Sequence, residues 1–439
     1  MRGLSLLVAF LVVSGAAPTS HAQKQTGPVS QPGPGGFVHV EGQRLVGAAG
    51  TDFKIRSIGV GSLRREAVEK DYADIAAMNL NSVTVTLDYR DFYASGQADK
   101  YVAPGWQRLN QHLTLARKYR LYVILQMCGI EGAQFIPLKD TAFDYRIWVE
   151  PDLQNRFLNL WQEIAKRYHD ETQIIGYGIF CEPVTAGTRK QWIDLANKAV
   201  VRIRMVDKNH ILFIERMYGE FGTRREISGI DFSPERSFFL LPDDNVVYQF
   251  YFFERDEYTH QQAPWREDRD RPLTYPDESF EIVYREALND RGRLFHWDSD
   301  YLDFYLARQV EFGRRHNVPM FVWAFGLMKN CFQNRGGLQW LRDLAELFQK
   351  QNVNWSYSDY RDHDFGVSDN PEAKAVLSSS HKNESGSTQA HEEDGVVRTH
   401  DGYRLFYRRD RDWPRCCSCS DLQEGIPPQF AMCSPHASP

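Results

Sequence analysis

Eight short apolar runs, most of them followed by a stretch with helical periodicity, constrain the fold of this chain more than any other feature. They comprise residues 53–60, 82–87, 121–127, 174–180, 211–214, 246–252, 320–325 and 354–357. The apolar residues after the third run include Leu158, Trp161, Ile164, Ala165 and Tyr168, a spacing that fits one face of a helix. Eight such units over roughly 330 residues predict a (β/α)8 TIM barrel. A doubly wound sheet is the alternative, but eight evenly spaced units fit a closed barrel better.

The N-terminal residues are typical of an export signal. Arg2, an apolar run at 4–13 and the small-x-small site Ser20-His21-Ala22 predict cleavage and a mature protein that begins near Gln23, secreted or periplasmic. The apolar run is too short for a membrane span, and no later segment is long and apolar enough. We therefore expect no membrane partner.

The remaining composition shifts predict the domain boundaries. We expect a signal peptide at 1–22, a linker at 23–36, the barrel at 37–370, a polar linker at 371–394 and a tail at 395–439. Asp401-Gly402 predicts a hairpin within the tail that is similar to the opening hairpin of α/β-hydrolase enzymes. That family's nucleophile elbow, acid and His are absent, so the tail is either a truncated start of such a domain or a disordered end.

Charge and aromatic content limit the possible partners. The formal net charge of -6 gives no electrostatic footprint for nucleic acid. A long excursion at 254–300, after the sixth run, carries Trp265, Tyr275 and Trp297. These rings are candidate sugar-stacking surfaces, with loop packing over the barrel mouth as the equal alternative.

The fourth run ends in Cys181-Glu182-Pro183. A carboxylate at the C-terminal end of a barrel strand stands where TIM-barrel enzymes carry out their chemistry. Glu182 is therefore the first candidate catalytic residue.

Several stretches resemble glycoside hydrolase family 5, the cellulase A family, in order and spacing along nearly all of 37–366. They are residues 121–134, 160–183, 247–261, 318–326 and 355–358. The resemblance implies a barrel that acts on polysaccharides of the β-glucan or β-mannan type without a cofactor or metal. It also implies a retaining reaction, with one glutamate after strand four as acid/base and a second after strand seven as nucleophile, about 5 Å apart.

The resemblance places Glu182 at the acid/base position but Ala324 at the nucleophile position. A methyl group cannot attack an anomeric carbon, so we expect retaining hydrolysis to be lost. The family's other signature positions also differ, and correspond here to Thr84, Cys128, Cys181, Tyr251, Phe253 and Ser358. Trp323 replaces the family's usual Gly and can fill the vacated volume.

Three functional hypotheses follow. The first is a glycan-binding protein that no longer hydrolyses, with Glu182 as an inert relict. The second is an active glycoside hydrolase in which Glu182, its pKa raised by desolvation, acts with a relocated nucleophile or base. Asp88, Glu215, Glu254 and Asp256 are the candidates, although for each of them a solvated loop charge is the favoured interpretation. The third is a structural or protein-interaction barrel.

The seven cysteines do not form an obvious disulfide framework, because three lie in the barrel and four in the tail. Cys128 and Cys181 end adjacent strands. They are either small apolar fillers, a disulfide, or, with Cys331 or Glu182, ligands of a thiophilic metal.

Overall fold

Eight parallel strands close into a barrel, which confirms the predicted (β/α)8 fold. The computed structural model describes residues 36–94, 97–133, 144–220, 237–264, 266, 272–286, 292–379 and 403–407. The barrel strands are β4 (Arg56–Ser62), β5 (Ser82–Asp88), β8 (Tyr122–Gly129), β9 (Ile174–Gly178), β11 (Ile211–Glu215), β13 (Val246–Tyr251), β16 (Met320–Phe325) and β17 (Asn354–Tyr357). The pairing of β17 with β4 completes the circle. Each predicted run overlaps one of these strands.

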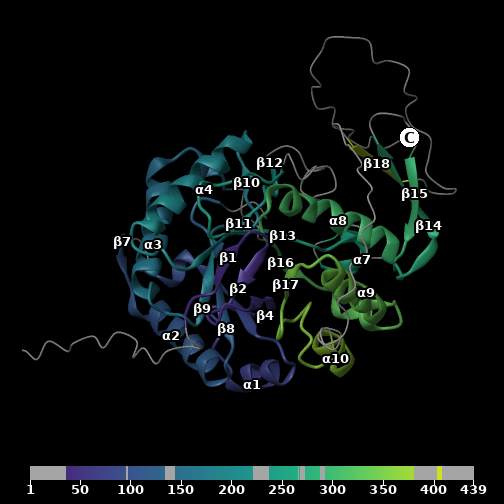
Figure 1. Ribbon diagram of the computed structural model, residues 1–439, viewed down its shortest axis with the longest axis horizontal. Helices are drawn as coiled ribbons and strands as arrows, with labels where there is room; N and C mark the ends of the chain where they lie inside the picture. The colour runs from purple at the N-terminus through teal and green to yellow at the C-terminus, as the bar shows by residue number, and fades with distance from the viewer. Residues whose placement is uncertain are drawn as a thin grey trace, which may run out of the picture.

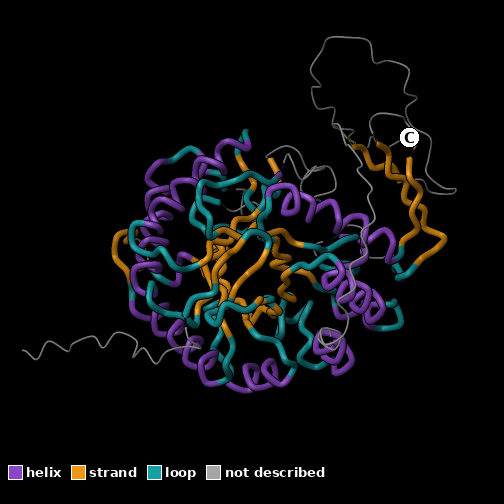
Figure 2. Tube along the Cα trace, viewed as in Figure 1, coloured by secondary structure: helices purple, strands orange, loops and turns teal. Residues whose placement is uncertain are grey.

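Helices surround the strands, as Figures 1 and 2 show. They are α1 (Glu69–Ala77), α2 (Ala103–Lys118), α3 (Pro151–Tyr168), α4 (Arg189–Arg204), α8 (Ser299–His316), α9 (Gly337–Lys350) and α10 (Pro371–Ser379), with a short α7 (Asp256–Thr259). Local sequence explains their ends: Asp298 caps α8 by accepting from two backbone N–H groups, and Asn317 ends it in the left-handed region. Within the described residues, none of the helices combines the length and the apolar character that a membrane span needs.

The barrel interior changes from apolar to polar along the strands. Ile124, Phe213 and Val247 belong to an inner apolar cluster, which the N-terminal hairpin of β1 (His39–Glu41) and β2 (Arg44–Val46) supplements with Leu45. Two residues farther along, on the same strand faces, the side chains are polar: Gln126, Glu215 and Gln249. The polar layer therefore lies toward the C-terminal ends of the strands, where a TIM barrel carries its site.

The predicted linker at 371–394 is wrong in its first part, because residues 371–379 form α10. Pro371 starts the helix, and the side chain of Asn370 accepts from the backbone N–H of Ala373. Ala373, Val376 and Leu377 recur at helical spacing and are buried, with α10 packed against α9. The polar composition of the neighbouring serines concealed this apolar stripe. The rest of the linker lies outside the described residues.

The excursion after β13 contains an antiparallel hairpin of β14 (Asp277–Glu286) and β15 (Gly292–Trp297). A strand of the tail, β18 (Tyr403–Tyr407), pairs antiparallel with β14, and Figure 1 shows the three strands beside the barrel. The tail thus has a strand where a hairpin arm was predicted, while the other arm and its turn lie outside the described residues. The short strands are β3 (Asp52–Phe53), β6 (Tyr93–Ala94), β7 (Gln97–Tyr101), β10 (Val184–Thr185) and β12 (Gly219–Glu220).

Candidate active site

A cavity of about 290 Å³ opens at the C-terminal ends of three neighbouring strands, β9, β11 and β13. Its walls come from the residues after those strands and from α8. They are Glu182, Arg216, Tyr218, Tyr251, Phe252, Phe253, Glu254, Asp256, His260 and Tyr305. Because this is the catalytic face of a TIM barrel, the cavity is the candidate active site.

Glu182 lines this cavity, and two hydrogen bonds fix the backbone just before it. The N–H of Cys181 donates to the carbonyl of Met127 at 2.9 Å, and the indole of Trp161 donates to the carbonyl of Ile179 at 3.0 Å. Burial raises the pKa of the Glu182 carboxyl to about 7, as the sequence led us to expect from desolvation. A large fraction of Glu182 therefore carries a proton at neutral pH, as a general acid must.

Glu215 ends β11 inside the barrel and does not line the cavity. Its carboxyl is fully buried and accepts a hydrogen bond from Gln249 at 3.2 Å. Burial and the neighbouring Glu182 raise the pKa of Glu215 well above its usual range, although Trp323 and the backbone N–H of Glu182 act in the opposite direction. Burial thus favours the acid form of Glu215, and its carboxyl stands inside the barrel rather than on the cavity wall.

The other three candidate carboxylates differ in position and charge. Glu254 lines the cavity, accepts from the Tyr301 hydroxyl at 2.7 Å, and has its pKa raised to about 7 by burial. Asp256 also lines the cavity. Burial alone would raise its pKa, but His260 and Arg266 lower it below the ordinary value. Asp88 pairs instead with Arg64 and Arg90 and is not part of the cavity wall.

Trp323 and Ala324 stand next to each other near the end of β16, where the resemblance places the family's nucleophile. Ala324 is 3% exposed, and its carbonyl accepts the N–H of Phe252 at 2.9 Å. Trp323 packs against the apolar cluster inside the barrel, and its indole is near enough to Glu215 to lower that pKa. The bulky ring thus occupies the barrel interior beside a position that carries only a methyl group.

The remaining positions that the resemblance singles out lie on or just after barrel strands, with Thr84 inside β5. Thr84 has its hydroxyl 3.2 Å from that of Ser57 and 3.0 Å from that of Ser356. Such a network of neutral hydroxyls needs no counter-charge. Ser358 donates its backbone N–H to Phe325 at 2.9 Å, and the ring of Phe253 lies 4.9 Å from that of His260.

Cys128 and Cys181 are free thiols, hydrogen-bonded to each other. Cys331 is free and buried elsewhere, with its Sγ 3.3 Å from the carbonyl of Tyr258. The described residues contain no group of three or more His, Cys, Asp or Glu side chains arranged to hold a metal ion. Of the three interpretations of this pair, the disulfide is wrong, because both thiols are free.

Two of the three candidate stacking rings are inside the protein, which corrects that expectation. Tyr275 is 3% and Trp297 1% exposed, and their rings contact each other edge to face at 5.0 Å. The loop-packing interpretation holds for both, because neither has a free face. Trp265 lies outside the described residues.

Sequence reasoning missed Arg216 and Tyr218, and it gave His260 no role. His260 places Nδ1 3.0 Å from Oδ1 of Asp256, and Tyr218 stacks near Tyr251 with ring centroids 4.8 Å apart. The only signal for Arg216 was its place two residues after the fifth apolar run, where a polar residue is ordinary.

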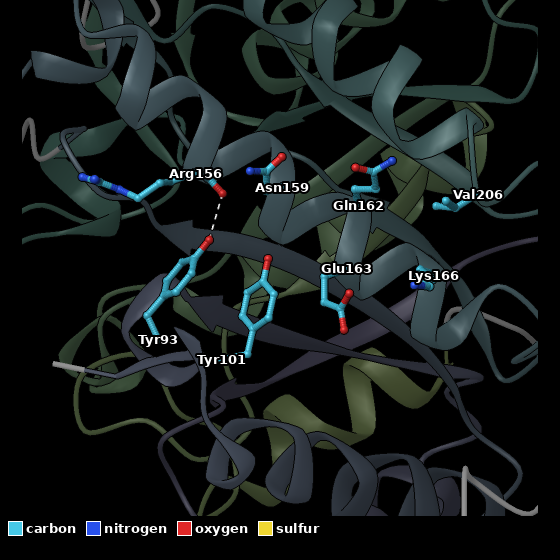
Figure 3. Close-up of a pocket in the computed structure, with 8 residues that line it drawn as sticks. All are labelled: Tyr93, Tyr101, Arg156, Asn159, Gln162, Glu163, Lys166 and Val206. Carbon is cyan, nitrogen blue, oxygen red and sulfur yellow. Dashed lines mark hydrogen bonds between the residues drawn. The ribbon is translucent and has the colours of Figure 1, made fainter. Parts of the chain in front are cut away.

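A second cavity, of about 500 Å³, lies on the flank of the barrel, where the β6–β7 hairpin faces the outer surface of α3. Its lining residues are Tyr93, Tyr101, Arg156, Asn159, Gln162, Glu163, Lys166 and Val206. Figure 3 shows the Tyr93 hydroxyl directed at the backbone carbonyl of Arg156, to which it donates at 3.0 Å. This cavity is larger, but it is remote from the strand ends and from Glu182, so it is not the candidate active site.

Comparison with known proteins gives a consistent family match. The family model described as cellulase (glycosyl hydrolase family 5) matches residues 46–364. Endoglucanase C of Acetivibrio thermocellus is 24% identical over 311 residues, which cover 68% of this chain and 85% of the relative. A beta-xylosidase of Phanerodontia chrysosporium is 23% identical over 353 residues, covering 76% of this chain and 67% of the relative.

Solved structures show the same fold. Endoglucanase Cel5A from Thermotoga maritima superposes with a TM-score of 0.57 at 19% identity, covering 73% of this chain and 96% of that one. The cellulose synthase subunit Z of Clostridioides difficile superposes with a TM-score of 0.55 at 17% identity, covering 74% and 99%.

Proposed function

The chain belongs to glycosyl hydrolase family 5, and on that basis we propose that it binds a β-linked glycan at the barrel mouth without retaining hydrolysis. One observation carries the proposal: Ala324 stands near the end of β16 (Met320–Phe325), at the position where the resemblance places the family's nucleophile. A retaining reaction needs a second carboxylate about 5 Å from the acid/base. An alanine supplies neither the nucleophile nor the charge that stabilises an oxocarbenium ion.

The surroundings of Glu182 support the same proposal. The neighbouring carboxyl, Glu215, stands inside the barrel and off the cavity wall, and burial raises its pKa, so it is poorly placed to replace the missing nucleophile. The hydroxyl network at Thr84 has no cation to brace a nucleophile. The polar lining and the rings of Tyr218, Tyr251 and Phe253 still suit sugar hydroxyls and sugar faces.

The test is to measure binding and turnover on one panel of β-glucans, β-mannans and β-xylans. Affinity electrophoresis reports binding, and a reducing-end assay reports cleavage. We expect retardation by at least one polysaccharide, reduced in Tyr251→Ala, with no reducing ends above the level of Glu182→Gln. Retardation by none of them would favour the structural or protein-interaction barrel.

A second candidate is inverting hydrolysis with Glu182 as acid and Asp256 as base. The observation that favours it is the opposite ionisation of the two carboxyls on one cavity: Glu182 has its pKa raised to about 7, whereas His260 and Arg266 hold Asp256 ionised against the effect of burial. An inverting pair needs one acid and one base. Reducing ends that both Glu182→Gln and Asp256→Asn abolish, with inverted anomers in the first products, would establish this candidate.

We also propose that the protein is exported. The support is the charged, apolar and small-residue pattern of residues 1–22. Expression with this segment, followed by N-terminal sequencing of the mature protein, tests it: cleavage near Gln23 is expected, and an intact Met1 in the cytoplasm would contradict it.

A further inference from the structure

Arg216 is a buried cation on the cavity wall that forms no ion pair with any described residue. It follows β11 and is 3% exposed. Its Nη1 donates to the side-chain carbonyl of Gln309 at 3.1 Å, and its guanidinium lies 5.3 Å from the centroid of the Tyr251 ring. Its Nε has no hydrogen-bond partner. A neutral amide and a ring face thus replace the carboxylate that a buried arginine normally has.

A buried cation without a counter-charge destabilises the folded protein unless a bound anion supplies that charge. A charge removed from water loses several kcal/mol of solvation, which a well-placed counter-charge offsets. Arginine is the side chain best suited to bind a carboxylate, because its planar group offers parallel N–H donors. The missing partner of Arg216 is therefore expected to be an anion that enters the cavity.

The other charged groups around the cavity do not supply that anion. Glu182 and Glu254 have pKa values raised to about 7, so both are largely neutral in mild acid. Asp256 is ionised but is already shared between His260 and Arg266. Glu215, the residue before Arg216, accepts a hydrogen bond from Gln249 inside the barrel, and burial raises its pKa. Below neutral pH, the positive charge of Arg216 is therefore not balanced by any carboxylate of the described cavity wall.

We propose that Arg216 binds a carboxylate of the ligand, so that the cavity selects a β-linked glycan that carries a uronic acid residue. The proposal rests on the glycan-binding function above and names its substrate class. The sugar carboxylate accepts from the guanidinium, and the rings of Tyr218 and Tyr251 contact the sugar beside it. A neutral glucan offers only hydroxyls to the same cation and leaves its charge uncompensated.

The cavity also predicts the pH dependence of this selection. As the pH rises through about 7, Glu182 and Glu254 ionise and repel a second carboxylate in the same small space. Asp256 stays ionised throughout. Binding of the uronate-bearing glycan should therefore be tighter at pH 5.5 than at pH 8, with no such loss for a neutral glycan.

The experiment uses a glucuronate-containing β-linked polysaccharide and the same polymer after chemical reduction of its carboxyls to neutral sugars. Affinity electrophoresis at pH 5.5 and low salt measures both polymers against the full chain. Wild type should bind the acidic polymer at least tenfold more tightly than its reduced form. Arg216→Gln should lose that preference, and Arg216→Lys should keep part of it. Arg315→Gln, which removes an exposed charge at the end of α8, should retain it fully.

Because Arg216 is buried, a variant that fails to fold would say nothing, so wild type alone is also tested in rising salt and at pH 8. Loss of the preference under both conditions supports the inference. Equal binding of the two polymers by wild type, or an unchanged preference in folded Arg216→Gln, overturns it but leaves glycan binding intact. Binding only to a sulfated glycan overturns the carboxylate assignment. Binding to no polysaccharide at all would instead contradict the proposed function.

Discussion

The ionisation of Glu182 gives a prediction that can be worked in numbers from its surroundings. Burial raises the pKa of its carboxyl from 4.5 to about 7, and one pKa unit corresponds to about 1.4 kcal/mol. Ionising Glu182 in the folded protein therefore costs about 3 kcal/mol at pH 8, an upper value because the residue is only partly buried. The stabilisation by the acid form is complete below pH 4.5 and is lost as the pH rises through about 7.

The substitution that tests this is Glu182→Gln, which keeps the shape and cannot ionise. At pH 8 the variant should be more stable than wild type, by up to about 3 kcal/mol, and at pH 4 the two should have the same free energy of unfolding. Urea unfolding followed by tryptophan fluorescence at pH 4, 6 and 8 measures the difference. Glu66→Gln, at an exposed carboxylate outside the cavity, is the matched control and should change stability little at any pH. A difference for Glu182→Gln that is constant with pH, or a less stable variant at pH 8, would refute the reasoning.

Three further predictions concern other parts of the molecule. Leu377→Ala should lower the free energy of unfolding by about 2–4 kcal/mol, because Leu377 is buried in α10 against the barrel; unaltered urea unfolding would mean that α10 is dispensable. Asp207→Asn should be destabilising at pH 6 and progressively less so as the pH falls toward 2. Burial alone would raise the pKa of Asp207, but the hydrogen bonds from His210 and Tyr177 outweigh burial and lower that pKa to about 2. A loss of stability that does not change with pH would argue against the charged hydrogen bond. Cys128 should react with a thiol reagent in the native barrel well before Cys331, since the first thiol is exposed and the second buried; mass mapping that finds Cys331 labelled first would contradict this placement.

The fold was accessible from sequence because its determinants are local. Runs such as 320–325 and 354–357 match β16 and β17 residue for residue, since strands buried on both faces are largely apolar, although Asn354 and Ser356 of β17 are buried polar residues. The failure at 371–379 has the opposite origin: a short helix with only three buried residues leaves a weak pattern among polar neighbours. Its role depends on the contact with α9, which the sequence does not display.

The site residues could be predicted from the sequence only at the positions that the family resemblance covers. Glu182 and Ala324 could be located by their place after the fourth and in the seventh apolar run. By contrast, Glu215 and Asp256 were equivalent candidates in the sequence, and only the fold places Glu215 inside the barrel with a raised pKa and Asp256 on the cavity wall with a lowered one. Arg216 was missed because the absence of an ion partner is a property of the folded cavity. The burial of Tyr275 and Trp297 was equally invisible, since an aromatic ring in a loop can face inward or outward.

The central claim is that this family member binds glycan without forming a covalent intermediate, and trapping that intermediate tests it most directly. A 2-deoxy-2-fluoro glycoside of the sugar that binds, carrying an activated leaving group, slows the second step of a retaining reaction so that the glycosyl-enzyme accumulates. The intact mass of wild type is then measured after prolonged incubation at saturating ligand. We predict an unchanged mass while the sugar remains bound at equilibrium. A mass increase by one glycosyl unit, mapped to a carboxylate of the barrel mouth, would contradict the account.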